Sequence, residues 1–429
     1  MMAIGMTIII PPIDWDVRLD RQTRFLLQLL KEKRMHGLRN ARIHRKSIPE
    51  SLTTDKCHYW LRHLAAIPAA SESGNSISIT TTSLSVHCWQ RAERARLILE
   101  RMEVIADDFK QYCHDQDQRQ HAADEGGGFY MHEIRRGILP SFPPLLTKSK
   151  ALPIPTSETY LLVLKLYATK YLHGKASVPE TCRAIVERMQ RNAMAAFDAE
   201  SAHKAGQENS NQAQTVSSSL SPIPTTQHWN QVIIAWANSI DPKRPIHAAQ
   251  IAHALDEQGM ADASTFSHAL RACVSLDSRQ QLATSEFVQL ALPVAQKLQN
   301  GLLARQLQKK DDPTYVPLEA FHIVHLLRVA RNLTSSSHQK QRNEMIRNTW
   351  QMATDHKKIN VHVLQELLHV ASPDLAHELV QPSEEGGDGT IRSSSSISAE
   401  VMNDALKLIQ VLPVEWIDHG NPDQDPYQW

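Results

Sequence analysis

Apolar residues spaced at i, i+3, i+4 and i+7 recur along much of this chain and constrain its fold more than any other feature. Side chains at that spacing line one stripe of an α-helix, so each set predicts an amphipathic helix with one buried face. The recurring stripe therefore predicts an all-α protein. Three sets begin on an aromatic residue: Tyr160, Val163, Leu164 and Tyr167; Trp229, Val232, Ile233 and Trp236; and Phe266, Ala269, Leu270 and Cys273.

A second helical stripe follows each of these aromatic-led stripes. The second stripes begin at Cys182, Ala248 and Phe287, roughly 20 residues after the aromatic residue before them, as in proteins built from repeated helix pairs. We therefore predict an α-solenoid of antiparallel helix pairs, with more degenerate pairs toward both ends of the chain. Residues suited to cap the first helices are Thr225 or Thr226, and Asp262 or Ser264.

Four polar segments separate the helical stretches, at residues 71–85, 114–128, 203–221 and 383–398. They hold too few apolar residues to offset the entropy of ordering, so we expect disordered inserts there. The resulting division has a basic segment with possible targeting function at 1–50, degenerate helix-pair repeats with inserts at 51–200, a Ser/Gln-rich linker at 201–223, the clearest repeats at 224–380, and a linker with a last helix at 381–429.

Charge and cysteine content narrow the function classes. The 46 Lys and Arg residues balance 46 Asp and Glu residues, so the whole chain is not a general polyanion binder, although a local face can still be basic. The five cysteines form no CxxC pair, which favours a reducing compartment. The apolar run at the N-terminus stops at Pro11 and is too short to span a membrane, so no membrane association is expected.

The motifs that carry catalysis are missing from the sequence. The glycines at 126–128 are not followed by the Lys-Ser/Thr of a phosphate-binding loop, and no G-x-S-x-G elbow occurs. Cys57, His58 and His63 are not spaced to put three metal ligands on one helix face. We therefore expect no enzyme activity, no catalytic residue, no metal site and no cofactor.

The stretch from Pro224 to Ala237 resembles the opening helix of a pentatricopeptide repeat, in which an aromatic residue is followed by Asn and then by an apolar stripe. Residues 261–267 resemble the junction into the next repeat, and residues 92–102 resemble the second helix of a repeat. The likeness is strongest from Trp229 to Phe266. Tetratricopeptide repeats have the same helical hairpin, but their Trp/Leu/Gly/Tyr signature is missing here.

The resemblance implies binding of single-stranded RNA, because repeats of this family read one base each with a few side chains. Carried over by motif, the reading positions fall on Asn230 and Asp262 in the best repeat, and Ser267 is the candidate RNA-binding residue of the next one. In the family this Asn and Asp pairing is associated with a pyrimidine, usually uracil. The resemblance also implies a mitochondrial or plastid protein acting in organellar RNA processing, stability or translation; without it, an intracellular soluble protein is expected.

An alternative is a scaffold that binds protein partners on the same helical-repeat surface, without RNA. The neutral net charge and the long inserts favour this alternative. DNA is not an expected partner in either case. Two further sets of residues could contact RNA or could be ordinary structure: the tryptophans Trp229, Trp236 and Trp350, and the basic clusters at 188–191, 305–310 and 340–347.

Overall fold

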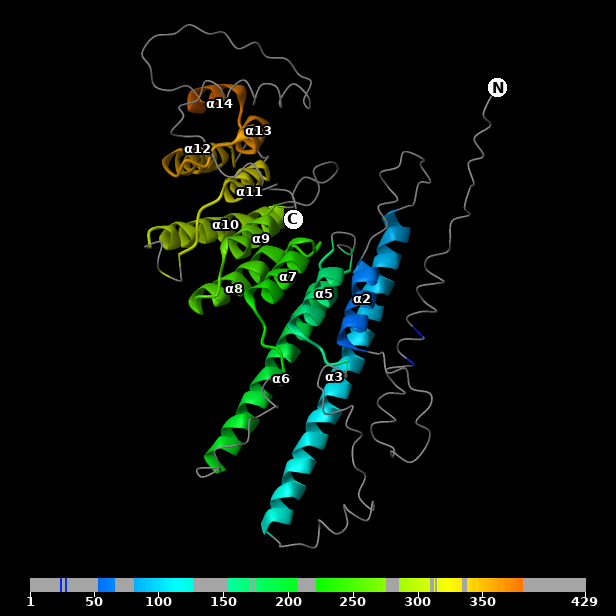
Figure 1. The fold of residues 1–429 in the computed structure, drawn as a ribbon. Helices are drawn as coiled ribbons and strands as arrows, with labels where there is room; N and C mark the ends of the chain where they lie inside the picture. The colour runs from blue at the N-terminus through cyan, green and yellow to red at the C-terminus, as the bar shows by residue number, and fades with distance from the viewer. Residues whose placement is uncertain are drawn as a thin grey trace, which may run out of the picture. The chain divides into compact units, whose positions relative to one another are not determined.

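The prediction of an all-α protein is confirmed by the computed structural model, in which the described residues form twelve helices and no strand (Figure 1). No helix in this part of the chain combines the length and apolar composition that a membrane span requires. The described residues are 53–65, 81–125, 153–169, 172, 175–206, 221–274, 285–308, 312, 315–333 and 338–380, together with Arg24 and Gln28.

Two predicted regions lie almost wholly outside this description. They are the basic segment at 1–50 and the linker with its last helix at 381–429, which includes the insert expected at 383–398. The described chain divides into two compact units. Residues up to Leu172 and from Thr181 to Pro224 belong to unit 1, while His173–Glu180 and residues from Thr225 onward belong to unit 2.

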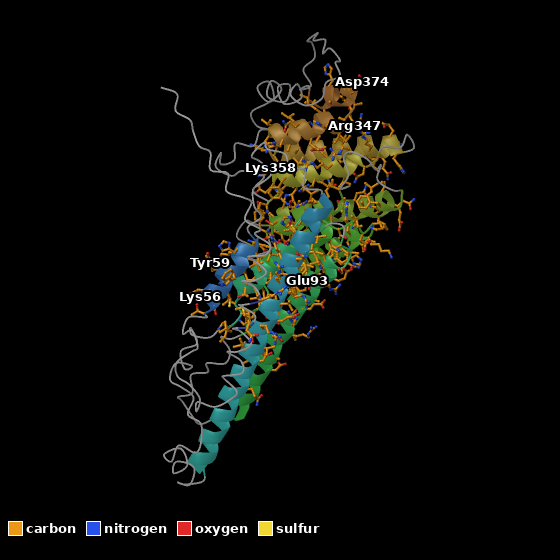
Figure 2. The ribbon with its side chains drawn as sticks, turned by 90° about the vertical axis from the view of Figure 1, so that its right-hand side faces the viewer. Lys56, Tyr59, Glu93, Arg347, Lys358 and Asp374 are labelled. Carbon is orange, nitrogen blue, oxygen red and sulfur yellow. The ribbon has the colours of Figure 1, made fainter. Side chains whose placement is uncertain are left out.

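Unit 1 contains α2 (Thr54–Ala65), α3 (Thr81–Glu125), α5 (Ser157–Tyr167) and most of α6 (Val178–Gly206). Helices α2, α3 and α5 all contact one another. The opposite face of α2 carries Lys56 and Tyr59 into solvent (Figure 2). The predicted stripes are buried here; the core includes Ala95, Ile98, Leu99, Met102, Tyr160, Val163, Leu164, Tyr167, Cys182, Ile185, Val186 and Met189.

The insert predicted at 114–128 is wrong over most of its length, and the insert predicted at 71–85 is wrong over its last five residues, its other residues lying outside the described part of the chain. Helix α3 already includes residues 81–85, and it continues to Glu125. Residues 115–125 include three Gln and two Ala, which are good helix formers, and adding turns to an existing helix needs no new nucleation. The insert expected at 203–221 likewise begins inside α6, which ends at Gly206, and its last residue, Ser221, is buried.

Unit 2 is a succession of eight further helices: α7 (Thr226–Ala237), α8 (Arg244–Glu257), α9 (Ala263–Ala272), α10 (Ser285–Gln306), α11 (Ala320–Arg331), α12 (Gln339–Asp355), α13 (Val361–Val370) and α14 (Pro373–Val380). Helix α7 contacts α8 and α9, α8 contacts α9 and α10, and α9 contacts α10 and α11. Helix α11 in turn contacts α12 and α13. From α7 to α11, each helix thus packs against the next one, and most helices of this unit also pack against the one after that.

The first helices of these pairs start in the same way. A reciprocal capping box joins the N-cap residue to the third helical residue in α5, α7, α9 and α11, which satisfies backbone N–H groups that a helix start leaves unpaired. Of the alternative caps predicted from the sequence, Thr225 and Asp262 are the ones used. The four pairs are Thr156 with Thr159, Thr225 with His228, Asp262 with Thr265, and Glu319 with His322.

The second helices α8 and α12 share features at both ends. Near the start of each, an arginine reaches the end of the following first helix: Arg244 donates to the carbonyls of Ala272 at 3.1 Å and Val274 at 2.5 Å, and Arg342 donates to the carbonyl of Val370. At the C-terminal end, the chain turns through a left-handed residue, Gly259 with φ 67 after α8 and Lys357 with φ 56 after α12. These contacts fix the helix pairs against their neighbours.

Candidate functional site

The two residues expected to read a base lie together at the junction of α7 and α9. Asn230 is on α7, and its Nδ2 donates a hydrogen bond to Oδ1 of Asp262 at 3.2 Å. Asp262 is the N-cap of α9, where the same Oδ1 accepts the backbone N–H of Thr265 at 2.7 Å and lies 2.8 Å from the Thr265 hydroxyl oxygen. The helix start therefore positions the carboxylate, and the carboxylate positions the carboxamide.

Both ends of the Asn230 carboxamide are used within the protein. Its Oδ1 accepts a hydrogen bond from the Thr265 hydroxyl at 2.8 Å, and the side chain is only 6% exposed. Asp262 is exposed, and every hydrogen bond that the described residues make to its side chain goes to Oδ1. The oxygen Oδ2 and the second amide proton of Asn230 are thus the groups left for a ligand at this junction.

Ser267 does not join this pair. It lies on α9 and is 8% exposed, and within the described part of the chain no hydrogen bond links it to Asn230 or Asp262. The next junction, between α9 and α11, is made instead by His322, whose Nε2 lies 2.8 Å from the carbonyl oxygen of Ala263. The one pairing that the sequence made legible is therefore also the one that the fold brings together.

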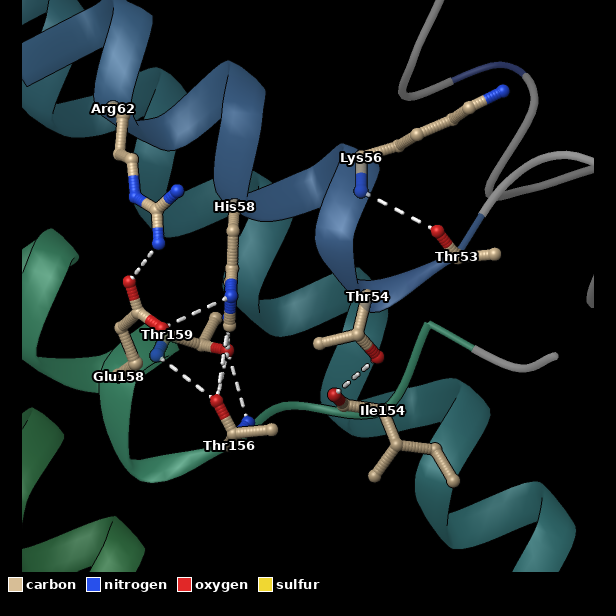
Figure 3. Close-up of polar contacts among 9 residues, drawn as sticks. All are labelled: Thr53, Thr54, Lys56, His58, Arg62, Ile154, Thr156, Glu158 and Thr159. Carbon is tan, nitrogen blue, oxygen red and sulfur yellow. Dashed lines mark hydrogen bonds and ion pairs between the residues drawn. The ribbon is translucent and has the colours of Figure 1, made fainter. Parts of the chain in front are cut away.

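The contact made by Asn230 has a counterpart in unit 1. Asn230 is the fifth residue after the N-cap of its helix, and His58 is the fifth residue after Thr53, where α2 starts. Nε2 of His58 lies 2.7 Å from the hydroxyl of Thr159, the third residue of α5 (Figure 3). In the same way, Oδ1 of Asn230 lies beside the hydroxyl of Thr265. A polar side chain at this position therefore joins one first helix to the next in both units.

The junction around His58 also carries charge. Its Nδ1 lies 3.4 Å from Oε2 of Glu158, which in turn pairs with Arg62 (Figure 3). Burial lowers the pKa of His58, and the negative charge of Glu158 opposes that effect. The hydrogen bond from Arg62 lowers the pKa of Glu158. His58 thus joins α2 to α5 beside an ion pair. At the equivalent position in unit 2, Asn230 joins α7 to α9 with an uncharged amide.

Between α9 and α11 the structure gathers basic side chains that the sequence reading missed. They are His268 and Arg271 on α9 and His322, His325 and Arg328 on α11. Burial lowers the pKa of His325 well below its usual value, and the charges of Arg328 and Arg271 lower it further. Counting from each N-cap would have found them, because Arg271 and Arg328 are both the ninth residue after the cap of their helix.

The basic clusters expected to contact phosphate are engaged within the protein at several positions. Arg188 donates to Oε1 of Glu103 at 3.1 Å, Arg305 donates to Oδ1 of Asp256 at 2.7 Å, and Arg347 pairs with Glu378. Of the three tryptophans considered for base stacking, Trp236 and Trp350 are 3% exposed and belong to the core, whereas Trp229 is partly exposed. Because they are buried, Trp236 and Trp350 cannot stack on a base at the surface.

No family model, curated protein or solved structure matches the chain. Among the described residues, no group of three or more His, Cys, Asp or Glu side chains is arranged to hold a metal ion. The junction of α7 and α9 and the neighbouring face of α11 are therefore the candidate site in unit 2.

Proposed function

We propose that unit 2 is an α-solenoid of pentatricopeptide-repeat type and that its first helices bind single-stranded RNA. The observation that carries the proposal is the 3.2 Å contact between Nδ2 of Asn230 and Oδ1 of Asp262. It supports a reading site because a carboxamide with a free proton and a carboxylate with a free oxygen present a donor and an acceptor side by side to a base edge.

The pattern of helix contacts supports the solenoid part of the proposal. The first helices of successive pairs contact each other: α7 contacts α9, and α11 contacts α13. The second helices α8 and α10 also contact each other. Stacked helix pairs of this kind bury a continuous core and leave one extended surface for a ligand. A location in a mitochondrion or plastid, and a role in RNA processing, stability or translation there, belong to the same proposal.

The test is binding of the full chain to pools of single-stranded RNA, with Asn230→Ala and Asp262→Ala combined in one variant. We expect the double variant to weaken RNA binding by about tenfold or more, since each lost polar contact is typically about 1 kcal/mol. No affinity in the wild type, or equal affinity in the variant, would refute the proposal.

A matched control separates lost contacts from a loosened junction. Thr265→Val removes the hydroxyl that bonds both Asn230 and Asp262, but it leaves the carboxamide and the carboxylate in the protein. It should cost stability of a similar order while RNA affinity falls much less than in the double variant. If Thr265→Val weakened RNA binding as strongly, the effect would belong to the packing of the junction.

A protein scaffold is the second candidate, and the burial of Asn230 favours it. A side chain that is 6% exposed and bonded at both ends is well explained as a structural tie between helices. In that case the face of the first helices would bind a protein partner. Partner capture from cells that survives RNase treatment and is unaffected by the double variant would support the scaffold over RNA binding.

A further inference from the structure

We propose that Arg271, Arg328 and Arg331, on the faces of α9 and α11, hold a phosphodiester group of the bound strand. This inference rests on the proposed RNA-binding function and names the place where the backbone is held. Phosphate contacts position a nucleic acid without reading its sequence, so this site would complement the base-facing pair at the α7 and α9 junction.

The cluster carries more positive charge than its surroundings neutralise. Glu366 on α13 is the shared partner of two arginines: its Oε2 accepts from Nε of Arg328 at 2.8 Å, and its Oε1 lies 3.4 Å from NH1 of Arg331. Arg271 makes no ion pair with a described residue; it donates one hydrogen bond to Oδ1 of Asn238 at 2.6 Å. Arg328 and Arg331 therefore share a single carboxylate, and Arg271, whose charge is felt at Arg328, adds a third guanidinium group without adding a carboxylate.

Arg328 and Arg331 are placed to reach a ligand, and Arg271 beside them is partly exposed. The side chains of Arg328 and Arg331 are 32% and 37% exposed, whereas the Glu366 side chain is only 10% exposed. The carboxylate is thus recessed between α11 and α13, and the guanidinium groups extend from it toward solvent. A planar guanidinium with several N–H donors is suited to the oxygens of a phosphate group.

His325 adds unused hydrogen-bonding capacity to the same face. Its Nδ1 is buried and has no hydrogen-bond partner within the described part of the chain. Buried polar atoms are normally paired, so an unpaired one beside uncompensated arginines is unusual for a surface whose only role is packing. Burial is the main cause of its lowered pKa, and the charges of Arg328, His322, Arg271 and His268 add to it. A bound anion would offset that repulsion.

The experiment measures the affinity of the full chain for random-sequence single-stranded RNA over a series of salt concentrations. Arg271→Gln removes the charge, and Arg271→Lys keeps it. We expect the slope of log affinity against log salt to fall by about 0.7 in Arg271→Gln, the value for one phosphate contact on a single strand, and to stay at the wild-type value in Arg271→Lys. The control is Arg347→Gln, an exposed arginine of α12 paired with Glu378 (Figure 2).

The outcomes separate the site from the proposed function. RNA binding with an unchanged slope in Arg271→Gln, or an equal loss of slope in Arg347→Gln, would overturn the phosphate site and leave RNA binding standing. If the wild type binds no RNA, thermal unfolding with inorganic phosphate against chloride at equal ionic strength decides the site. Stabilisation by phosphate that Arg271→Gln abolishes supports an anion site for another phosphorylated ligand, and no stabilisation overturns it.

Discussion

Oδ1 of Asn230 accepts a hydrogen bond from the hydroxyl of Thr265 at 2.8 Å, so the residue that resembles a base reader also ties α7 to α9. The same position in α2 is filled by His58, which contacts Thr159 of α5. A polar residue there has a structural role whether or not a ligand binds. Its two roles can be measured separately, because one concerns stability and the other affinity.

Asn230→Ala should destabilise the junction of α7 and α9. It removes the acceptor of the Thr265 hydroxyl and the donor to Asp262, at an expected cost of about 1–3 kcal/mol for a buried polar group that loses its partner. Hydrogen exchange should become faster in α7 and at the start of α9. Gln231→Ala, on a partly exposed neighbouring position of α7, is the matched control and should leave the exchange rates unchanged. Equal protection in Asn230→Ala and the wild type would show that the contact is not stabilising.

Unit 2 should lose stability in mild acid because of His322 and His268. Burial lowers the pKa of each to about 4 from the usual 6.5. The unfolded chain therefore binds protons first, so stability is full above about pH 6.5 and falls as the pH drops toward 4, by up to about 3 kcal/mol for each residue. Nδ1 of His322 accepts the backbone N–H of Glu319 at 2.9 Å, which protonation of that nitrogen would prevent.

His322→Gln tests this assignment. Glutamine is suited to the third position of a capping box and cannot titrate in this range. The variant should show a weaker pH dependence of unfolding, measured by denaturant titration at pH 7 and at pH 4.5, than the wild type. His369→Gln, at an exposed position of α13, should change nothing. A wild-type pH dependence that survives in His322→Gln would rule out this histidine as a source.

Substitutions at the equivalent residues that follow α8 and α12 should have opposite effects on stability. Lys357 adopts φ 56 and Gly259 adopts φ 67, a left-handed conformation that glycine adopts without the strain of a β-carbon. Lys357→Gly should therefore stabilise the protein, and Gly259→Ala should destabilise it, each by about 1 kcal/mol. Thermal unfolding of the two variants checks the prediction. Destabilisation by Lys357→Gly would mean that contacts of the lysine side chain outweigh the backbone strain.

In unit 1, Tyr160 should stabilise the fold by donating a hydrogen bond to the buried carboxylate of Glu103. The tyrosine hydroxyl donates to Oε1 of Glu103 at 2.7 Å, and Nε of Arg188 donates to the same oxygen at 3.1 Å. Burial raises the pKa of Glu103, and both donors oppose that effect. Tyr160→Phe should cost about 1–3 kcal/mol because it leaves a buried carboxylate short of a partner. Urea titration of both variants measures the loss of unfolding free energy. Tyr59→Phe, on the exposed face of α2, is the control and should lose less than about 0.5 kcal/mol.

The sequence predicted those parts of the fold that follow local rules. The stripe beginning at Phe266 and the cap at Asp262 are set by residues within one helix, and both are confirmed. The predicted insert at 114–128 was wrong because composition alone does not separate a solvent-exposed helix from a linker, and α3 was already nucleated upstream. Arg271 and Arg328 both stand nine residues after their N-caps, a signal that points to their grouping only once α9 and α11 are known to pack side by side.

The candidate site was also predicted only in part, because some of its contacts are local in the sequence and others depend on how helices pack. Asn230 and Asp262 could be paired through the resemblance to a repeat, and the structure brings them together. The sequence could not show that the Thr265 hydroxyl bonds Oδ1 of Asn230. That contact depends on the distance between the starts of two helices. Ser267 was singled out by sequence position alone, and its burial in α9 follows from the packing of that helix.

The most direct test of the central claim is to map where RNA touches the full-length protein. Single-stranded RNA carrying a photoactivatable uridine analogue would be crosslinked to the chain, and the modified peptides identified by mass spectrometry. We expect crosslinks in α7, α9 and α11, concentrated near Asn230, Arg271 and Arg328. Crosslinks confined to other segments, or none at a concentration of RNA that saturates binding, would contradict it.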